Sequence, residues 1–403
     1  MIKKISVSEL IPGMYIHDLN CEWMEHPFLT NSFPVDGQAR IAKIRSLGIQ
    51  EVYIDTERGI DLPHAPTAEQ VQKDLHQRMQ SIAATHTERP NPVDLITEAP
   101  RAKKLHTEAN RIIKNLMTDV RLGAQIEVER MEPLVESMID SIFRNQSALL
   151  PLAGLKKHDT YTFEHSVSVC ALMVAFAREL DLPYQTIKDI ALGALLHDVG
   201  KAMVPDYILN KPASLTAKEF VAMKDHVVYS IEILKQTPGI VPVAMNVAAQ
   251  HHERHDGSGY PHRLKGGEIS LYGQMASIVD VYDAISSNRV YHRGLPPSAA
   301  LTKLLEWSEH HFDPRLVHNF IRAIGIYPAG SLVRLESGRL AVVREQNEGD
   351  LLYPRVEIIY NTDLGCYLTP ELIDLRSGND RVISNEDFNK WHINPKPWLP
   401  SAS

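Results

Sequence analysis

The side chains in this sequence that could do chemistry are histidines and aspartates spread between residues 165 and 280. They are His165, His197, Asp198, His226, His251, His252 and Asp280. Each lies in, or at the end of, a segment with a helical pattern, so side chains far apart in sequence could converge inside one helical bundle. Imidazole and carboxylate groups suit first-row divalent metals. The adjacent pair His197-Asp198 offers a nitrogen to one metal and a bridging oxygen to a second, which predicts a dinuclear hydrolase.

Taken singly, some of these residues have a simpler structural explanation. A lone buried histidine such as His165 or His226 is more often a hydrogen-bonded core residue than a metal ligand. The pair His251-His252 is harder to explain in that way. So is Asp280, because burying an unpaired carboxylate on an apolar helix is costly. As a set, the residues favour a metal site over several unrelated structural roles.

Two further polar residues lie next to this set in the sequence. Lys201 follows the apolar segment ALGALLHDVG, three residues after Asp198, and one turn of spacing would place its ammonium near whatever the metals bind. A phosphate oxygen is the natural partner for that charge. Asp283, one turn beyond Asp280, could cap its helix, support a ligand histidine or face solvent, and we expect it to support a ligand.

A glycine-rich loop follows the histidine pair directly, with the sequence HHERHDGSGYPHRLKGGEI over residues 251–269. Glycine permits backbone angles that other residues resist, and proline stiffens the middle of the loop. Tyr260 offers a ring for base stacking or a hydroxyl for hydrogen bonding. A plain surface turn is the simpler interpretation of such a loop, but its attachment to the histidine pair favours a role in binding. The loop residues concerned are Asp256, Gly257, Gly259 and Pro261.

The rest of the sequence indicates what must position these groups. Residues 1–65 mix short strand-like runs with one expected helix, GQARIAKIRSLG, which ends at Gly48. Residues 86–92 are typical of a linker. Two amphipathic helices are expected over 98–146, and helical patterns continue to about residue 325. Beyond that point, runs rich in β-branched residues separated by turn residues predict a small β-rich part.

Composition excludes several classes of function. The chain has 403 residues, 44% of them hydrophobic, and a net charge of -8, which argues against general nucleic-acid binding. Its three cysteines form no CxxC pair and suggest no disulfide framework, so we expect a reducing compartment. We find no signal-peptide pattern and no apolar run of about 18 residues, and therefore expect a cytoplasmic protein without a membrane span.

At the motifs HDVGK (197–201), HHE (251–253) and HDGSGYP (255–261), the chain resembles the HD-GYP proteins, a bacterial branch of the HD-domain metal-dependent phosphohydrolases. The resemblance spans roughly residues 150–325, and residues 1 to about 125 resemble, more weakly, a module that precedes HD-GYP in some members. It implies a mainly α fold: an HD-type helical bundle with a small α/β N-terminal module and a short β-rich C-terminal appendage. We accordingly expect an accessory module over 1–125, a catalytic domain over 126–327 and the appendage over 328–403.

The resemblance also implies a site and a substrate. The seven histidines and aspartates would bind two divalent metals, iron or manganese, with Asp198 as the bridge, and the substrate would be cyclic di-GMP. Asp198 and Lys201 would be catalytic. Lys201, Tyr260 and Arg289 would contact the substrate.

Two departures from the family pattern affect these expectations. Members with a third metal carry a glutamate four residues before the first histidine, and that position is Tyr161 here. Glu164 directly precedes His165 and should point elsewhere, so we expect two metals. The second departure is the segment 288–293, NRVYHR, where the family reads closer to DRPYR. Arg289 is kept, but the shape of the pocket around it differs.

These observations give a main hypothesis and two alternatives. The main one is a phosphodiesterase that opens cyclic di-GMP to pGpG, with GMP as a further product. The first alternative is a sensor or interaction module without turnover, which contacts a diguanylate cyclase (GGDEF domain) through the Tyr260 loop. The second is a hydrolase of another cyclic dinucleotide. The helices over 98–146 also make a homodimer a possibility.

Overall fold

The computed structural model describes residues 1–21, 28, 30–84, 91–153, 161–211, 215–287, 294–347, 349–378 and 380–398. The chain forms two compact units. One contains Met1–Arg78 and Asp206–Met223, and the other contains Met79–Pro205 and Lys224–Ser403. Helix α8 (Ala217–Lys235) begins in the first unit and ends in the second.

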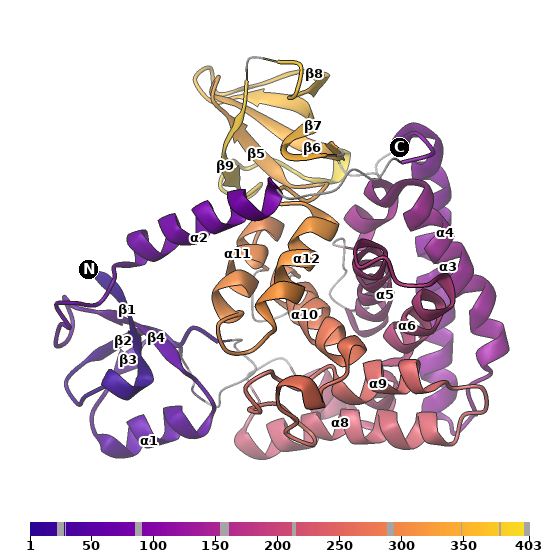
Figure 1. The fold of residues 1–403 in the computed structure, drawn as a ribbon, viewed down its shortest axis with the longest axis horizontal. Helices are drawn as coiled ribbons and strands as arrows, with labels where there is room; N and C mark the ends of the chain where they lie inside the picture. The colour runs from indigo at the N-terminus through magenta and orange to yellow at the C-terminus, as the bar shows by residue number, and fades with distance from the viewer. Residues whose placement is uncertain are drawn as a thin grey trace. The chain divides into compact units, whose positions relative to one another are not determined.

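The first unit is built on a four-stranded antiparallel sheet with the order β1-β4-β2-β3 (Figure 1). The strands are β1 (Ile2–Ser6), β2 (Tyr15–Asp18), β3 (Phe33–Pro34) and β4 (Glu51–Asp55). Helix α1 (Gln38–Ser46) buries Ile41 and Ile44 in the core of this sheet and is followed by Gly48 at φ +78°, as predicted. The unit also contains the short helix α7 (Asp206–Leu209) and the first part of α2 (Ala68–Ala83).

The second unit is dominated by helices, and α5 lies at its centre. Its neighbours are α3, α4, α6, α10 and α12, so α5 is enclosed on most sides. The helices not yet bounded are α3 (Leu95–Arg121), α4 (Val128–Ala153), α5 (Tyr161–Glu179), α6 (Tyr184–Leu196), α9 (Pro242–Gln250), α10 (Leu271–Ser286), α11 (Pro297–Trp307) and α12 (Pro314–Ile324).

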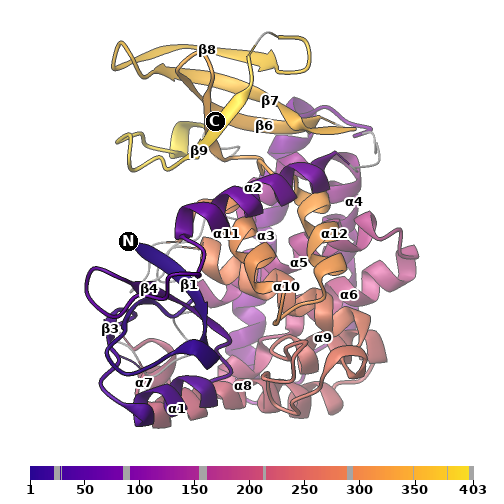
Figure 2. The ribbon, with the colours of Figure 1, turned by 60° about the vertical axis from the view of Figure 1, so that its left-hand side comes forward.

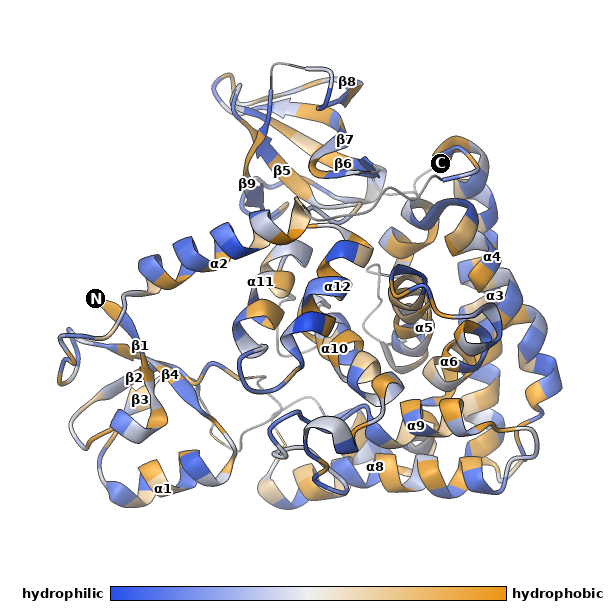
Figure 3. Ribbon diagram, in the orientation of Figure 1, coloured by the Kyte–Doolittle hydropathy of each residue, from blue (hydrophilic) through white to orange (hydrophobic). Residues whose placement is uncertain are grey.

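Hydrophobicity explains this arrangement. Figure 3 shows α5 and α10 mostly in the colours of hydrophobic residues, as expected for helices that are buried on most sides. Local signals define where the neighbouring helices begin and end. Ser270 caps α10 by accepting a hydrogen bond from the Gly273 amide at 3.1 Å, and Asp313 caps α12 by accepting one from the Arg315 amide at 2.8 Å.

The C-terminal part of the second unit is a five-stranded antiparallel sheet with the order β8-β7-β6-β5-β9 (Figure 2). Its strands are β5 (Leu332–Leu335), β6 (Arg339–Asn347), β7 (Asp350–Asn361), β8 (Cys366–Asp374) and β9 (Val382–Glu386). Leu332, Leu340, Val342 and Ile359 form its core together with Ile393.

A kink in α4 connects the helices to this sheet. Asn145 has φ -164° and ψ 102° inside the helix, and its side-chain amide donates to the Val93 carbonyl and to the Glu345 carboxylate, both at 3.0 Å. Gln146, the next residue, donates to the Ala323 carbonyl at 3.1 Å. The interruption of α4 therefore directs two amides towards other elements.

The predicted architecture is confirmed: the chain is mainly helical, with a small α/β N-terminal module and a β-rich C-terminal part. The two helices expected over 98–146 are α3 and α4, which pack against each other and against α5. Strands β3 and β9 were not anticipated, the greater part of the predicted linker lies outside the described residues, and the domain boundaries at 125 and 327 stay predictions. None of the helices among the described residues has the length and hydrophobicity needed to cross a membrane.

Candidate metal centre

All seven histidines and aspartates singled out in the sequence come together in the second unit. They form two groups of three side chains, and in each group the candidate ligand atoms lie within 4.8 Å of one another. One group is His165, His197 and Asp280, and the other is His226, His251 and His252. Four helices, α5, α6, α8 and α10, and the end of α9 supply them.

Asp198 lies between the two groups. Its Oδ2 is 3.4 Å from Nε2 of both His165 and His197. Its Oδ1 is 3.3 Å from Nε2 of His226 and 3.9 Å from Nε2 of His251. One carboxylate oxygen therefore faces each group, which is the placement that a bridging ligand needs.

Asp280 also reaches both groups, which the sequence did not indicate. Its Oδ1 lies 3.0 Å from Nε2 of His165, and its Oδ2 lies 3.7 Å from Nδ1 of His252. The two carboxylates thus approach the same pair of positions from α10 and from the end of α6.

Two of the histidines are oriented by the same local device. His197 follows the last turn of α6 and His251 follows the last turn of α9, and in each the Nδ1 atom lies 2.8 Å from the carbonyl oxygen three residues earlier, Ala194 or Ala248. A hydrogen on Nδ1 satisfies that carbonyl and leaves Nε2, which faces the cluster, as the ligand atom.

His165 is oriented from a different helix. Its Nδ1 lies 2.6 Å from Oδ2 of Asp283, whose other oxygen accepts a hydrogen bond from the Ser168 hydroxyl. The Ser287 hydroxyl donates to the backbone carbonyl of Asp283 at 2.6 Å. Of the three roles open to Asp283 in the sequence, this geometry corresponds to support of a ligand histidine.

The environment favours ionised carboxylates. Burial alone would raise the pKa of Asp198, but the charges of Lys201 and His197 outweigh it and hold that pKa well below its ordinary value. Burial opposes ionisation of Asp280 as well, and its hydrogen bond with His165 reverses the effect and lowers its pKa. Both side chains are thus in the form that binds cations.

Two histidines of the second group, His251 and His252, are held neutral. Burial, assisted by the positive charge of His197, lowers the pKa of His251 to about 3. Burial and the neighbouring His251 lower the pKa of His252 well below its ordinary value. His197 differs, because the negative charge of Asp198 overcomes the effect of burial and raises its pKa. Neutral imidazole is the form that coordinates a metal.

The residues present fit two first-row divalent metals. Oδ1 of Asp198 and Nε2 of His251 are buried, and among the described residues neither takes part in a hydrogen bond. Buried polar atoms without hydrogen bonds are costly unless another partner compensates, and a metal ion is the partner that suits this donor set. Glu164 belongs to neither group. Nothing is described of the Tyr161 side chain, so the expectation of two rather than three metals stays a prediction.

Lys201 lies beside the Asp198 carboxylate, close to the candidate metal ligands, as its spacing predicted. It belongs to the 3-10 turn Val199–Met203 that follows Asp198, and its ammonium contacts Oδ2 of Asp198. The turn is anchored to α8 by the Gly200 amide, which donates to the Ser230 hydroxyl at 2.9 Å.

The glycine-rich loop that follows the histidine pair, called the signature loop below, folds back on the histidines and aspartates of the candidate metal centre. The Tyr260 ring stacks on His252, with 4.6 Å between ring centroids, and the Lys224 ammonium lies 4.5 Å from the centroid of the same ring. The ring is therefore in contact with two side chains. Lys224 was not anticipated.

Backbone requirements explain the glycines and the aspartate of the loop. Gly257 adopts φ +84°, and a Cβ at Gly259 would lie 2.4 Å from the Arg254 amide nitrogen. Oδ1 of Asp256 accepts the Ser258 amide at 2.9 Å. Pro261 follows a cis peptide bond.

Glu253 is the residue that the sequence reasoning overlooked. It is 1% exposed, and its two carboxylate oxygens accept the amides of His262 at 2.8 Å and Leu264 at 3.0 Å. It therefore ties the far side of the signature loop to the residues that directly follow the histidine pair. The sequence signal for Glu253 was its place in the HHE motif, next to the two histidines. That position did not indicate which groups its carboxylate would contact. Arg289 lies outside the described residues.

Comparisons with known proteins show what this chain resembles. An HD domain family model matches residues 143–316, and a domain of unknown function, DUF3391, matches residues 2–131. The chain is 38% identical over 400 residues to the "Cyclic di-GMP phosphodiesterase PA4108" of Pseudomonas aeruginosa, covering 98% of this chain and 94% of that protein. It is 43% identical over 123 residues to the "3'3'-cGAMP-specific phosphodiesterase 2" of Vibrio cholerae, covering 30% of this chain and 24% of that protein.

Among solved structures, an HD-GYP-like protein of Bdellovibrio bacteriovorus, Bd1817, matches with a TM-score of 0.47 and 18% identity, covering 79% of this chain and 98% of that one. The near full-length relative, the HD domain match and the HDGSGYP motif beside the histidine pair lead to one conclusion: the chain belongs to the HD-GYP family of HD-domain phosphodiesterases, with a DUF3391 module at its N-terminal side.

Proposed function

We propose that this chain hydrolyses cyclic di-GMP to linear pGpG, using two bound divalent metals, iron or manganese. The observation that carries the proposal is the position of Asp198, with one oxygen towards each of two histidine groups. The substrate is suggested by the named activity of the relative that aligns along nearly the whole chain.

The reaction adds one water across one phosphodiester bond. The water oxygen bonds to phosphorus, the bond from phosphorus to a ribose oxygen breaks, and that oxygen leaves as a hydroxyl. When bound, two metals of this kind supply a nucleophilic water and neutralise charge on the phosphoryl oxygens.

The side chains of the protein then have separate tasks. His165, His197 and Asp280 would hold one ion, and His226, His251 and His252 the other, with Asp198 between them. Lys201 would neutralise charge on a phosphate oxygen, because its ammonium already lies at the shared carboxylate. Glu253 would keep the signature loop, and with it the Tyr260 hydroxyl, in place.

The test is cyclic di-GMP hydrolysis by anaerobically purified protein loaded with Fe(II) or Mn(II), with the products separated by chromatography. We expect turnover with accumulation of pGpG, and loss of both turnover and bound metal in Asp198→Ala. Full activity in Asp198→Ala would refute the site. Tight binding of cyclic di-GMP without product would instead identify a sensor, and the search for a diguanylate cyclase partner would follow.

A second substrate has specific support. The cGAMP-specific relative of Vibrio cholerae reaches 43% identity, although over only 30% of this chain. Cyclic di-GMP and 3'3'-cGAMP differ in one base, so the metal site would serve both and the purine contacts would decide between them. Comparing kcat/KM for the two substrates on the same metal-loaded sample identifies the preferred one.

A further inference from the structure

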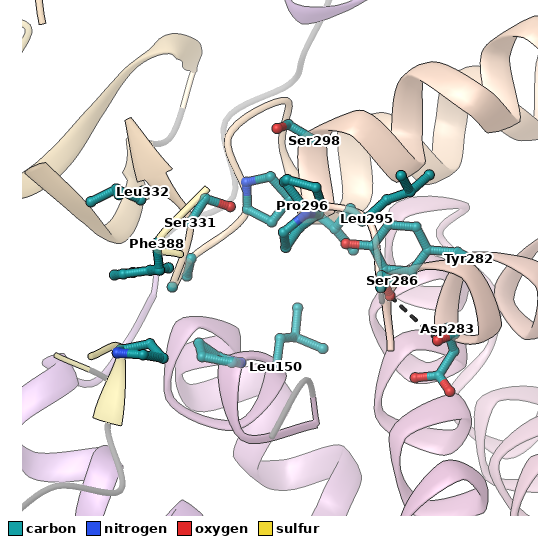
Figure 4. A pocket seen from close by; sticks show the side chains of 18 of the residues that line it. Leu150, Tyr282, Asp283, Ser286, Leu295, Pro296, Ser298, Ser331, Leu332 and Phe388 are labelled. Atoms are coloured by element: carbon teal, nitrogen blue, oxygen red, sulfur yellow. Dashed lines mark hydrogen bonds between the residues drawn. The ribbon is translucent and has the colours of Figure 1, made fainter. Parts of the chain in front are cut away.

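A cavity of about 260 Å³ lies within the second unit, behind the metal centre. It is lined by residues at the kink of α4, by residues of α5 and α10, by residues 294–298, and by residues at the first and last strands of the C-terminal sheet. Figure 4 shows Tyr282 and Asp283 on one side, Ser331 and Phe388 on the other, and Leu150 below. The volume far exceeds that needed for one water molecule and approaches the lower end of the range for small-molecule sites, roughly 300 Å³.

Polar atoms in the wall of this cavity have hydrogen-bonding capacity to spare. The hydroxyls of Ser298 and Ser331 are each in side chains only 3% exposed, and among the described residues neither has a hydrogen-bond partner. Gln346 donates its amide to the Tyr327 carbonyl, whereas its Oε1 accepts no hydrogen bond from the described residues. Buried polar atoms of this kind are uncommon unless a ligand or ordered water satisfies them.

The charges of the wall limit what could bind. The described lining contains three carboxylates, Asp283, Glu386 and Asp387, and neither lysine nor arginine. A phosphate or carboxylate group would be repelled there. The carboxylates of Asp283, Glu386 and Asp387 already accept hydrogen bonds from the protein. The lining groups without hydrogen bonds from the described residues are therefore two hydroxyls and an amide oxygen.

The cavity shares one residue with the metal centre. Asp283 lines the cavity and also holds Nδ1 of His165 at 2.6 Å. A ligand in the cavity would press on Asp283 and its neighbours Tyr282 and Ser286, and a change in the position of Asp283 would turn the imidazole of His165.

We propose that this cavity is a regulatory site for a small, uncharged molecule with an apolar body and a hydrogen-bond-donating head, and that its occupancy alters metal binding through Asp283 and His165. The apolar body would lie against Leu150, Tyr282 and Phe388. The head would engage the Ser331 and Ser298 hydroxyls and Oε1 of Gln346. The regulatory part rests on the proposed metal-dependent function, whereas ligand binding itself does not.

Benzamide is a suitable probe, because it joins a planar ring to an uncharged amide, and benzoate is nearly the same shape with a negative charge. Binding of each to the full-length protein would be followed by ligand-observed NMR. We expect saturable benzamide binding and affinity for benzoate at least tenfold weaker. Absence of benzamide binding up to its solubility limit, or equal affinity for benzoate, would overturn the proposal.

Variants place the binding in the cavity. Ser331→Ala removes a hydroxyl, Ser331→Leu fills space, and Ser298→Ala provides a second test if the Ser331 variants unfold. We expect about tenfold weaker benzamide binding in Ser331→Ala and none in Ser331→Leu. Ser137→Ala is the matched control, because Ser137 is exposed on α4 and donates to the Pro133 carbonyl. Unchanged affinity in the folded cavity variants would contradict the assignment.

Coupling is measured by repeating the titration with Mn(II)-saturated protein. Because linkage is reciprocal, benzamide affinity should change by about fivefold or more when the metals are bound. An unchanged affinity would refute the regulatory part. Benzamide binding without cyclic di-GMP hydrolysis would count against the proposed function alone, and hydrolysis without benzamide binding would count against the cavity alone.

Discussion

Asp283 orients His165, which is a metal ligand in our proposal. One oxygen of its carboxylate is hydrogen-bonded to Nδ1 of His165, and the other accepts a hydrogen bond from the Ser168 hydroxyl. We predict that Asp283→Asn weakens Mn(II) binding by about 10- to 100-fold, because loss of the charge makes His165 a poorer and less ordered ligand. Equilibrium dialysis gives the affinity directly. Asp189→Asn, at a half-buried position of α6 where the carboxylate accepts a hydrogen bond from Gln185, is the control, and equal affinities in the two variants would contradict the assigned role.

Lys201 acts on the substrate and not on the metals in our proposal. Lys201→Ala should retain normal metal content while kcat/KM falls by about 10²- to 10³-fold, because one positive charge at the phosphate is lost. Metal analysis and steady-state kinetics on the same sample separate the two effects. Lys188→Ala is the control. Lys188 lies on α6, the helix that ends just before His197, and it pairs with Glu136 on α4 at 2.8 Å. A fall in metal content would show instead that Lys201 stabilises Asp198.

At this scale the sequence predicted which seven histidines and aspartates come together, because each belongs to a short motif whose neighbours are also characteristic. Three features were not predictable, namely the position of Asp280 between both histidine groups, the ring contact of Lys224 with Tyr260, and the anchoring of the loop by Glu253. These depend on how α8, α9 and α10 pack, and residue spacing along one helix carries no information about that.

Helices α3 and α4 are joined by a buried ion pair. Glu98 on α3 is fully buried and accepts hydrogen bonds from Arg144 at 2.7 and 2.9 Å and from Ser141 at 2.8 Å. We predict that Glu98→Gln lowers the free energy of unfolding by about 2 kcal/mol, because the charge-assisted hydrogen bonds are lost and Arg144 is left without its partner. Urea denaturation measures the change. Glu108→Gln, an exposed position on the same helix, should cost almost nothing.

The same pair predicts a dependence on pH. Burial alone would raise the pKa of Glu98, but the hydrogen bonds from Arg144 and Ser141 hold it below the ordinary value of 4.5. A lowered folded-state pKa means that the stabilisation is complete above 4.5 and is lost as the pH falls through the folded value. The stability difference between the native chain and Glu98→Gln should therefore shrink in acid. A difference that grows as the pH falls would contradict the assignment.

Elements were predictable where the pattern was long and periodic. The amphipathic stripes gave α3 and α4, and the β-branched runs gave strands β5 to β8. The two missed strands lack such a signal. Strand β3 is only two residues long, and β9 (VISNE) is largely polar and occupies the sheet edge next to β5. Edge strands of this kind are defined by pairing with a neighbour and not by their own composition.

Within the second unit, the attachment of the C-terminal sheet to the helices decides whether the two unfold together. Asn145 contributes to this attachment, because its amide joins the α4 kink to Glu345 on β6 and to the Val93 carbonyl. Glu345 in turn pairs with Arg355 on β7 at 2.8 Å. Sequence could not predict this link, since a polar residue in the middle of an apolar helix gives no sign of a partner 200 residues away.

We predict that Asn145→Ala lowers the free energy of unfolding by about 1 to 3 kcal/mol, because the Val93 carbonyl and the Glu345 carboxylate lose a donor in a buried place. Asn115→Ala, at an exposed position of α3, is the control and should change stability little. Calorimetry gives the more decisive result. If Asn145 holds sheet and helices in one cooperative unit, the transition of the second unit should broaden or split in Asn145→Ala. A single sharp transition at an unchanged temperature would mean that packing between β6 and α4 suffices without it. In that case the helices and the sheet that line the cavity would unfold together even without the Asn145 hydrogen bonds.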